Sequence, residues 1–67
     1  MRGKVKAIKR DKGYGFVTGE DGLDRFFHAN HLEDVDFAEL QEGNAVEFEP
    51  YTEEKKGERA RRVKVVK

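Results

Sequence analysis

The feature that most constrains this 67-residue chain is a short segment in which aromatic and small residues alternate. Residues 12–17 read KGYGFV, so a single glycine separates Tyr14 from Phe16. Successive side chains of a β-strand point to opposite faces, and both rings would therefore share one face of a strand. Gly15 and Val17 would share the other face. The segment predicts a strand with aromatic rings on one side and packing residues on the other.

A second segment, at residues 24–28, repeats this arrangement after a turn at residues 19–22. Phe26 and His28 would lie on one face of this strand and Phe27 on the other. Neighbouring strands lie about 4.8 Å apart, so the rings of the two strands would form one continuous platform. Phe27 is expected in the core.

Glycines and alternating apolar residues divide the chain into short segments. Strands are expected over residues 3–9, 13–18, 24–28, 44–51 and 58–66. The spacing of three between Val5 and Ile8 predicts a bulge near Ala7. Asn30 is expected to cap a short helical turn, and residues 33–43 to form a longer acidic connection. Five short strands predict an all-β fold, a small closed or nearly closed barrel that uses all 67 residues as one domain.

The predicted sheet is apolar on both faces where the rings lie. A chain of 67 residues has little material for a second layer over the outer face. A ligand with flat faces would cover the rings, and single-stranded bases fit because every base has a π-face that stacks on an aromatic ring. The alternative is a structural aromatic cluster without a ligand.

The net charge of zero hides a strong segregation of charge along the chain. Residues 1–18 carry a net charge of +5, residues 19–54 of −11 and residues 55–67 of +6. If the two basic ends meet in the fold, they would form a positive stripe that can follow a phosphate backbone. Alternatively, the basic ends attract the acidic middle. The charge pattern alone leaves both open.

Composition excludes several classes of function. The chain has no cysteine, which rules out disulfides and thiolate metal sites and fits a cytoplasmic location. No apolar run approaches the roughly 20 residues that span a bilayer. His28 and His31, with Asp24, lack the further ligand that a metal site needs, so no metal or cofactor is expected. Without serine or cysteine as nucleophile, and without a marked carboxylate pair, no catalytic residue is expected and the chain is not predicted to be an enzyme.

Four segments resemble the cold-shock protein family in order and spacing. Residues 12–17 look like the first RNP-type motif of that family, and RFFH at residues 25–28 resembles the second. GKVK at residues 3–6 is similar to the family's opening, and LQEGNAVEF at residues 40–48 to the segment that enters its fourth strand. The resemblance covers residues 3–66. It implies a five-stranded antiparallel OB-type β-barrel that binds single-stranded RNA or DNA with low sequence preference, as an RNA chaperone.

The chain departs from the family pattern at aromatic positions. Ala7 and Ile8 stand where the family usually has Trp and Phe, and Ala29 stands where a Phe follows the motif histidine. A lost base stack costs about 1–3 kcal/mol, so the affinity should fall at least about tenfold. Some further cations would compensate and make binding more salt-sensitive. They are Lys9, Arg10, Arg61 and Arg62.

The residues expected to bind nucleic acid form two groups. Those expected to stack on bases are Tyr14, Phe16, Phe26, His28 and, by the resemblance, Phe37, which could instead cover the barrel end. Those expected to contact phosphates are Lys6, Lys12, Arg25 and Lys56. The chain is expected to act as a monomer, without a small-molecule substrate or a membrane. The rival hypothesis is a protein-interaction module on the same barrel, with reduced or lost nucleic-acid binding and the acidic middle region docking a basic partner.

Overall fold

The strands form where apolar residues alternate with charged ones between glycine-containing turns. The computed structural model describes residues 1–33 and 35–66. Within them the elements are β1 (Arg2–Lys9), β2 (Tyr14–Gly19), β3 (Asp24–His28), η1 (Ala29–His31), β4 (Leu32–Glu33), β5 (Ala45–Glu53) and β6 (Gly57–Val65). In these ranges only the 3₁₀ turn η1 is helical, and no helix there is long and apolar enough to cross a membrane.

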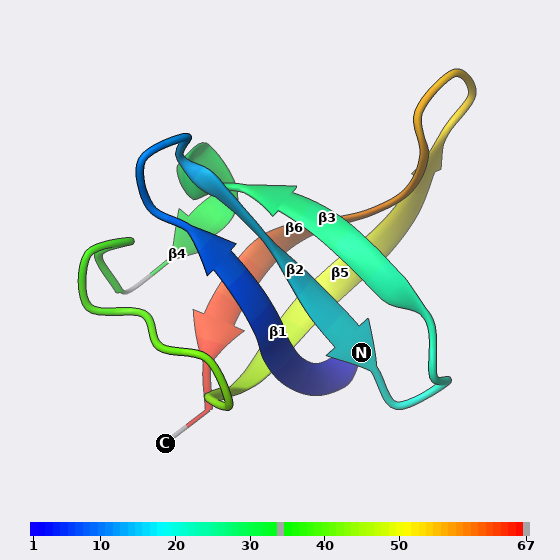
Figure 1. Cartoon of the computed structure of the whole chain (residues 1–67). Coiled ribbons are helices and arrows are strands. Elements are labelled where there is room, and N and C mark those ends of the chain that lie inside the picture. Colours follow the sequence, from blue (N-terminus) through cyan, green and yellow to red (C-terminus); the bar gives the residue numbers. More distant parts are fainter. Residues whose placement is uncertain (34, 67) are drawn as a thin grey trace.

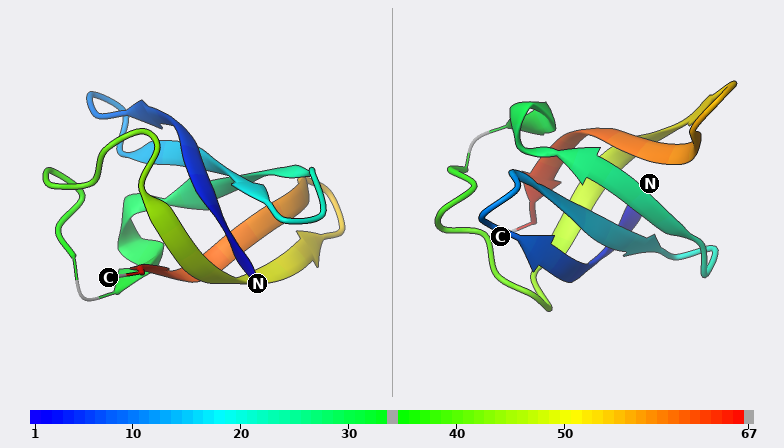
Figure 2. Two further views of the ribbon diagram at one scale, coloured as in Figure 1. Left: turned by 90° about the horizontal axis from the view of Figure 1, so that it is seen from below. Right: turned by 45° about the horizontal axis from the view of Figure 1, so that its top comes forward.

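Five of these strands close into a ring, which Figures 1 and 2 show from three directions. The strands β3, β2, β1, β5 and β6 follow one another as antiparallel neighbours. The ring closes where β3 runs parallel to β6, through the pair Phe26 and Arg59. The short β4 continues along the same edge of β6, where Leu32 pairs with Val63. The predicted five-stranded barrel is confirmed, and its closing seam is parallel.

Two irregularities bend the long strands. The register of β1 against β2 shifts between Val5 and Ala7, which leaves Lys6 without a partner in the ladder. This confirms the predicted bulge. A second shift occurs between β5 and β6, where Arg62 has a φ of 54°, in a region that non-glycine residues rarely adopt. Bulges increase the local twist of a strand, which helps so few strands to close into a barrel.

The core lies inside the ring, between the two halves of the barrel. Its buried apolar residues are Val5, Val17, Phe27, Leu40, Val46, Phe48, Ala60 and Val63. Phe27 lies directly opposite Gly15 on the neighbouring strand. A Cβ atom on Gly15 would come 2.8 Å from Cζ of Phe27 and 2.6 Å from the carbonyl oxygen of Ala7. The predicted core position of Phe27 is confirmed, and Gly15 provides the space for its ring.

Two local predictions are wrong. Asn30 does not cap the helical turn; His28 does, because its Nδ1 accepts a hydrogen bond of 3.2 Å from the amide of Asn30. The last residue of β3 thus takes the cap position, two residues before Asn30. The acidic connection predicted at residues 33–43 is displaced by one residue, because Glu33 pairs with Lys64 as part of strand β4 and β5 begins only at Ala45.

Replacing Gly15 with alanine should lower the free energy of unfolding by about 1–3 kcal/mol, because the added methyl group overlaps the Phe27 ring and a backbone oxygen. Urea denaturation followed by circular dichroism measures this loss. In a Phe27→Leu background the same substitution should cost less, since part of the overlap is gone. An unchanged unfolding midpoint in Gly15→Ala would contradict this packing.

Candidate nucleic-acid interface

The pairing of β2 with β3 brings four of the predicted residues together on the outer face of the barrel. Tyr14 lies opposite His28, and Phe16 lies opposite Phe26. The ring centroids of Tyr14 and Phe26 are 5.1 Å apart, and Phe16 lies 5.9 Å from each of them. The three aromatic rings are half-buried and His28 is exposed. We call this group of four side chains the aromatic face.

A hollow of about 380 Å³ adjoins the aromatic face at Phe16 and Phe26. The small side chain of Ala7 lines it, together with Lys6 and Lys56. Asp24, at the rim, accepts hydrogen bonds from Nζ of Lys6 and from the hydroxyl of Thr18. These bonds, chiefly the one from Lys6, lower the pKa of Asp24, so this carboxylate stays charged. Lys6 therefore lies at the face, but it is paired with an acid of the same chain.

Unpaired lysines lie at both ends of the aromatic face. Lys9 pairs with Tyr14 in the β1–β2 ladder, and Lys12 follows in the turn between these strands. Lys56 lies at the opposite end, beside the hollow. In the part of the chain that the structure describes, none of these three lysines makes an ion pair. Positive charge is thus available where a strand would enter and leave the rings.

The structure corrects the prediction for Arg25. Its side chain points inward and is almost fully buried, with Nη2 at 2.7 Å and Nη1 at 3.1 Å from the two carboxylate oxygens of Asp21. Nε lies 3.5 Å from Glu58, and the guanidinium covers the ring of Phe48. A charge held in this way is not available to a phosphate. The alternation of side chains along the strand already indicated burial of Arg25, since Arg25 lies on the same face as Phe27.

Phe37 does not join the aromatic face. Its ring packs edge-on against the core ring of Phe27, with centroids 6.5 Å apart. Arg10 holds this loop, because its guanidinium donates hydrogen bonds to the carbonyl oxygens of Phe37, Ala38 and Leu40. Phe37 thus covers one end of the barrel, and its stacking on a base stays a prediction. Arg10 is expected from the sequence to act as a further cation for nucleic acid, but its guanidinium fixes this loop.

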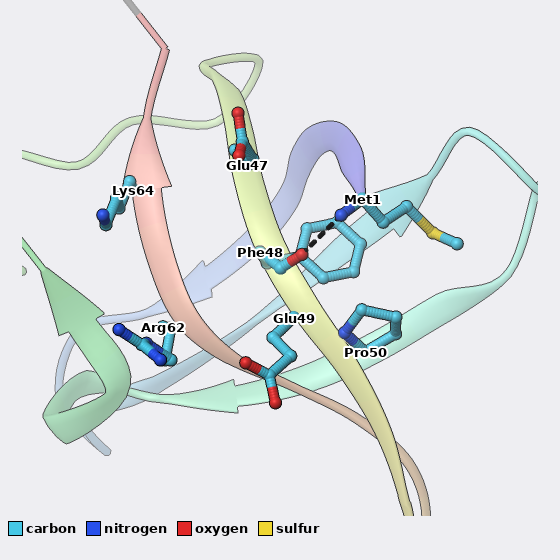
Figure 3. A pocket seen from close by; sticks show the side chains of 7 residues that line it. All are labelled: Met1, Glu47, Phe48, Glu49, Pro50, Arg62 and Lys64. Atoms are coloured by element: carbon cyan, nitrogen blue, oxygen red, sulfur yellow. Dashed lines mark hydrogen bonds between the residues drawn. The ribbon is translucent and has the colours of Figure 1, made fainter.

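Most other cations pair with acidic residues of the same chain. On β6, Arg61 binds Glu49, while Arg62 and Lys64 both lie within 3.6 Å of Glu33. Arg62 and Lys64 line a second hollow, of about 300 Å³, between β5 and β6 (Figure 3). Unlike the hollow beside the aromatic face, it is lined by none of the four side chains of that face. Of the two interpretations of the segregated charge, the ion pairs support attraction between the basic ends and the acidic middle.

Among the described residues, the two histidines have no set of neighbouring side chains that could hold a metal ion with them. Nδ1 of His28 is occupied by the amide of Asn30. In residues 1–33 and 35–66, no three His, Cys, Asp or Glu side chains lie close enough to hold a metal ion. The sequence does not indicate the contact made by Arg59, whose guanidinium carbon lies 4.2 Å from the centroid of the Phe26 ring. No local pattern indicates this contact, because it crosses the parallel seam between β3 and β6.

The protein should lose stability as the pH falls from about 4 towards about 2. Hydrogen bonds from Arg25, and then from the amide of Leu23, lower the pKa of Asp21 from 3.8 to about 2. The unfolded chain therefore takes up this proton first, and the stabilisation present above pH 3.8 disappears as the pH approaches the folded value. In Asp21→Asn the melting temperature should be lower at neutral pH and should fall less steeply in acid.

Thermal unfolding followed by circular dichroism across this pH range provides the measurement. Glu20→Gln is the control, because this exposed neighbour has no ion pair among the described residues and should keep the wild-type pH dependence. Equal acid slopes in the wild type and Asp21→Asn would show that the Arg25 pair does not act in this way.

Comparisons with known proteins agree with the geometry over nearly the whole chain. A sequence model of the family described as "'Cold-shock' DNA-binding domain" matches residues 1–66. A "Cold shock-like protein" of Thermotoga maritima is 52% identical over 66 residues, which cover 98% of each chain. One of Aquifex aeolicus is 46% identical over 67 residues, covering 98% of this chain and 94% of that protein. The "Cold shock protein CspB" of Geobacillus stearothermophilus is 45% identical over 49 residues, covering 73% and 74%. The chain belongs to the cold-shock domain family.

Proposed function

We propose that this chain binds single-stranded nucleic acid by stacking successive bases on the aromatic face, and that it acts as an RNA chaperone. The observation that carries the proposal is the set of three rings, each within 5.9 Å of the others, with His28 beside them on the outside of the barrel. Stacking on such rings is tolerant of sequence, because every base has a π-face. Low base preference follows.

The reduced platform makes the affinity of this chain depend on few contacts. With Ala7 at the hollow and Ala29 after His28, the strand has fewer rings to stack on than a full platform would offer. Each base–ring stack contributes about 1–3 kcal/mol, so each remaining ring carries a large share of the affinity. Lys12 and Lys56 would contact phosphates directly, while Lys6 would have to leave Asp24 to do so.

Chaperone activity needs no further chemistry. Weak base pairs in RNA open spontaneously, and a protein that stacks the unpaired bases shifts this equilibrium towards the open strand by mass action. No cofactor or source of energy is required. The cytoplasmic location, the monomeric state and the absence of enzymatic activity expected from the sequence stay predictions.

Phe16→Ala should weaken binding to a fluorescently labelled, pyrimidine-rich single strand about 5- to 150-fold, because the loss of one stack costs about 1–3 kcal/mol. Titration followed by fluorescence anisotropy gives the dissociation constant. Leu23→Ala is the matched control, since it removes an exposed apolar side chain outside the aromatic face and should leave the affinity unchanged. Absence of saturable binding by the wild type at low salt would overturn the proposed function.

The affinity should also decrease with salt, with a slope of log K against log salt of about −2 if about three phosphates are neutralised. Lys12→Gln and Lys56→Gln should each reduce this slope by about 0.7. Lys64→Gln removes a cation that is paired with Glu33, away from the aromatic face, and should not alter the slope. Anisotropy titrations at four or more salt concentrations separate these outcomes, and a larger loss in Lys64→Gln than in Lys12→Gln would contradict the assignment.

A further inference from the structure

The outer surface beside the aromatic face continues across the seam of the barrel. Arg59 on β6 pairs with Phe26 on β3, and Tyr51 on β5 pairs with Arg59. Residues paired across neighbouring strands point to the same side of a sheet. Phe26, Arg59 and Tyr51 therefore form a row over three adjacent strands.

Arg59 contributes a flat cationic group to this row. Its guanidinium carbon lies 4.2 Å from the centroid of the Phe26 ring, and 18% of its side chain is exposed. Its ion pair with Glu53 is long, at 3.5 Å, and among the described residues its buried Nε has no hydrogen-bond partner. Guanidinium planes stack on nucleic-acid bases much as aromatic rings do, and they also attract phosphates. Arg59 is thus placed beside the rings with few competing contacts.

Tyr51 extends the row by one more ring. It is half-buried, and its hydroxyl donates a hydrogen bond of 3.5 Å to Oε1 of Glu53, the same oxygen that Arg59 approaches. The guanidinium of Arg61 lies 4.9 Å from its centroid. Glu53 therefore contacts both side chains and holds Arg59 and Tyr51 next to each other.

The row lies on the side of the aromatic face opposite to Ala7 and Ile8, two of the positions that lack a ring. Ala7 belongs to β1, which borders β2, whereas Arg59 and Tyr51 lie beyond β3 on β6 and β5. Stacking groups are therefore absent at the β1 edge of the platform and present at the β6 edge.

We propose that the binding surface of this chain is displaced across the seam, so that the bound strand passes from the aromatic face over Arg59 to Tyr51. This inference rests on the proposed function, because it concerns the path of the same ligand. It assigns a nucleic-acid-binding role to Arg59, through its planar guanidinium as well as its charge, and to Tyr51 through its ring.

Four variants test this path by anisotropy with a labelled pyrimidine-rich single strand of about eight nucleotides, a length within the range that one OB fold covers. Arg59→Lys keeps the charge but loses the flat group, and should weaken binding about three- to tenfold with an unchanged salt slope. Tyr51→Leu should weaken binding by a similar factor, whereas Tyr51→Phe keeps the ring and should bind like the wild type. Arg2→Lys is the control, since Arg2 pairs with Glu47 at the start of β1.

Circular dichroism of each variant shows whether it is folded, and the dissociation constants are compared only between folded proteins. If Phe16→Ala weakens binding while Arg59→Lys and Tyr51→Leu bind like the wild type, the proposed function stands and the displaced path is wrong. Tighter binding by Arg59→Lys would also overturn the inference, because it would show that the guanidinium blocks the Phe26 ring. If the wild type does not bind, the inference fails together with the proposed function.

Discussion

The register between β2 and β3 is the constraint on which the core and the outer surface both depend. Gly15 lies opposite Phe27 in this register, and the buried ring occupies the space that a glycine leaves. Because the side-chain period of a strand is two, a slip by one residue would turn Phe27 outward and the neighbouring rings inward. The close packing at Gly15 therefore fixes the interior of the barrel and, through the same ladder, the position of Tyr14 and Phe16 on its exterior.

Because of ion pairs within the chain, the two basic ends do not simply form a positive stripe. Strand β6 is rich in arginine, yet it lies beside acidic residues of β4 and β5 that neutralise it. Surface pairs of this kind contribute only about 0–1 kcal/mol each, so they do not explain the stability of the fold. They decide which cations are free for a ligand. Among the described residues without an ion pair, Lys9, Lys12 and Lys56 lie at the ends of the aromatic face.

Local alternation was sufficient to predict the hairpin of β2 and β3, the side on which each ring lies and the burial of Phe27. These features depend on residues that are close in sequence, and a period of two is enough to place them. Arg25 was misplaced because its charge was given more weight than its position in the strand. Burial is tolerated there because Asp21 and Glu58 compensate the guanidinium.

Contacts between distant segments could not be predicted in the same way. Arg59 reaches Phe26 only because β6 runs parallel to β3 at the closure of the ring, and no neighbouring residue signals that pairing. The position of Phe37 at the barrel end likewise depends on Arg10, which lies in another loop and binds three backbone oxygens. The resemblance to the cold-shock family indicated the OB-type barrel, whereas these contacts became evident only in the structure.

The parallel contact between β3 and β6 has the shortest ladder of the ring, with a single pair of residues, Phe26 and Arg59. Barrels tend to open locally where strands share the fewest backbone contacts, so exchange of amide hydrogens should be fastest along this edge. A ligand that rests on both Phe26 and Arg59 would hold the two edges together. Binding and closure of the barrel would then be thermodynamically linked. Bound nucleic acid would raise the free energy of unfolding of the protein.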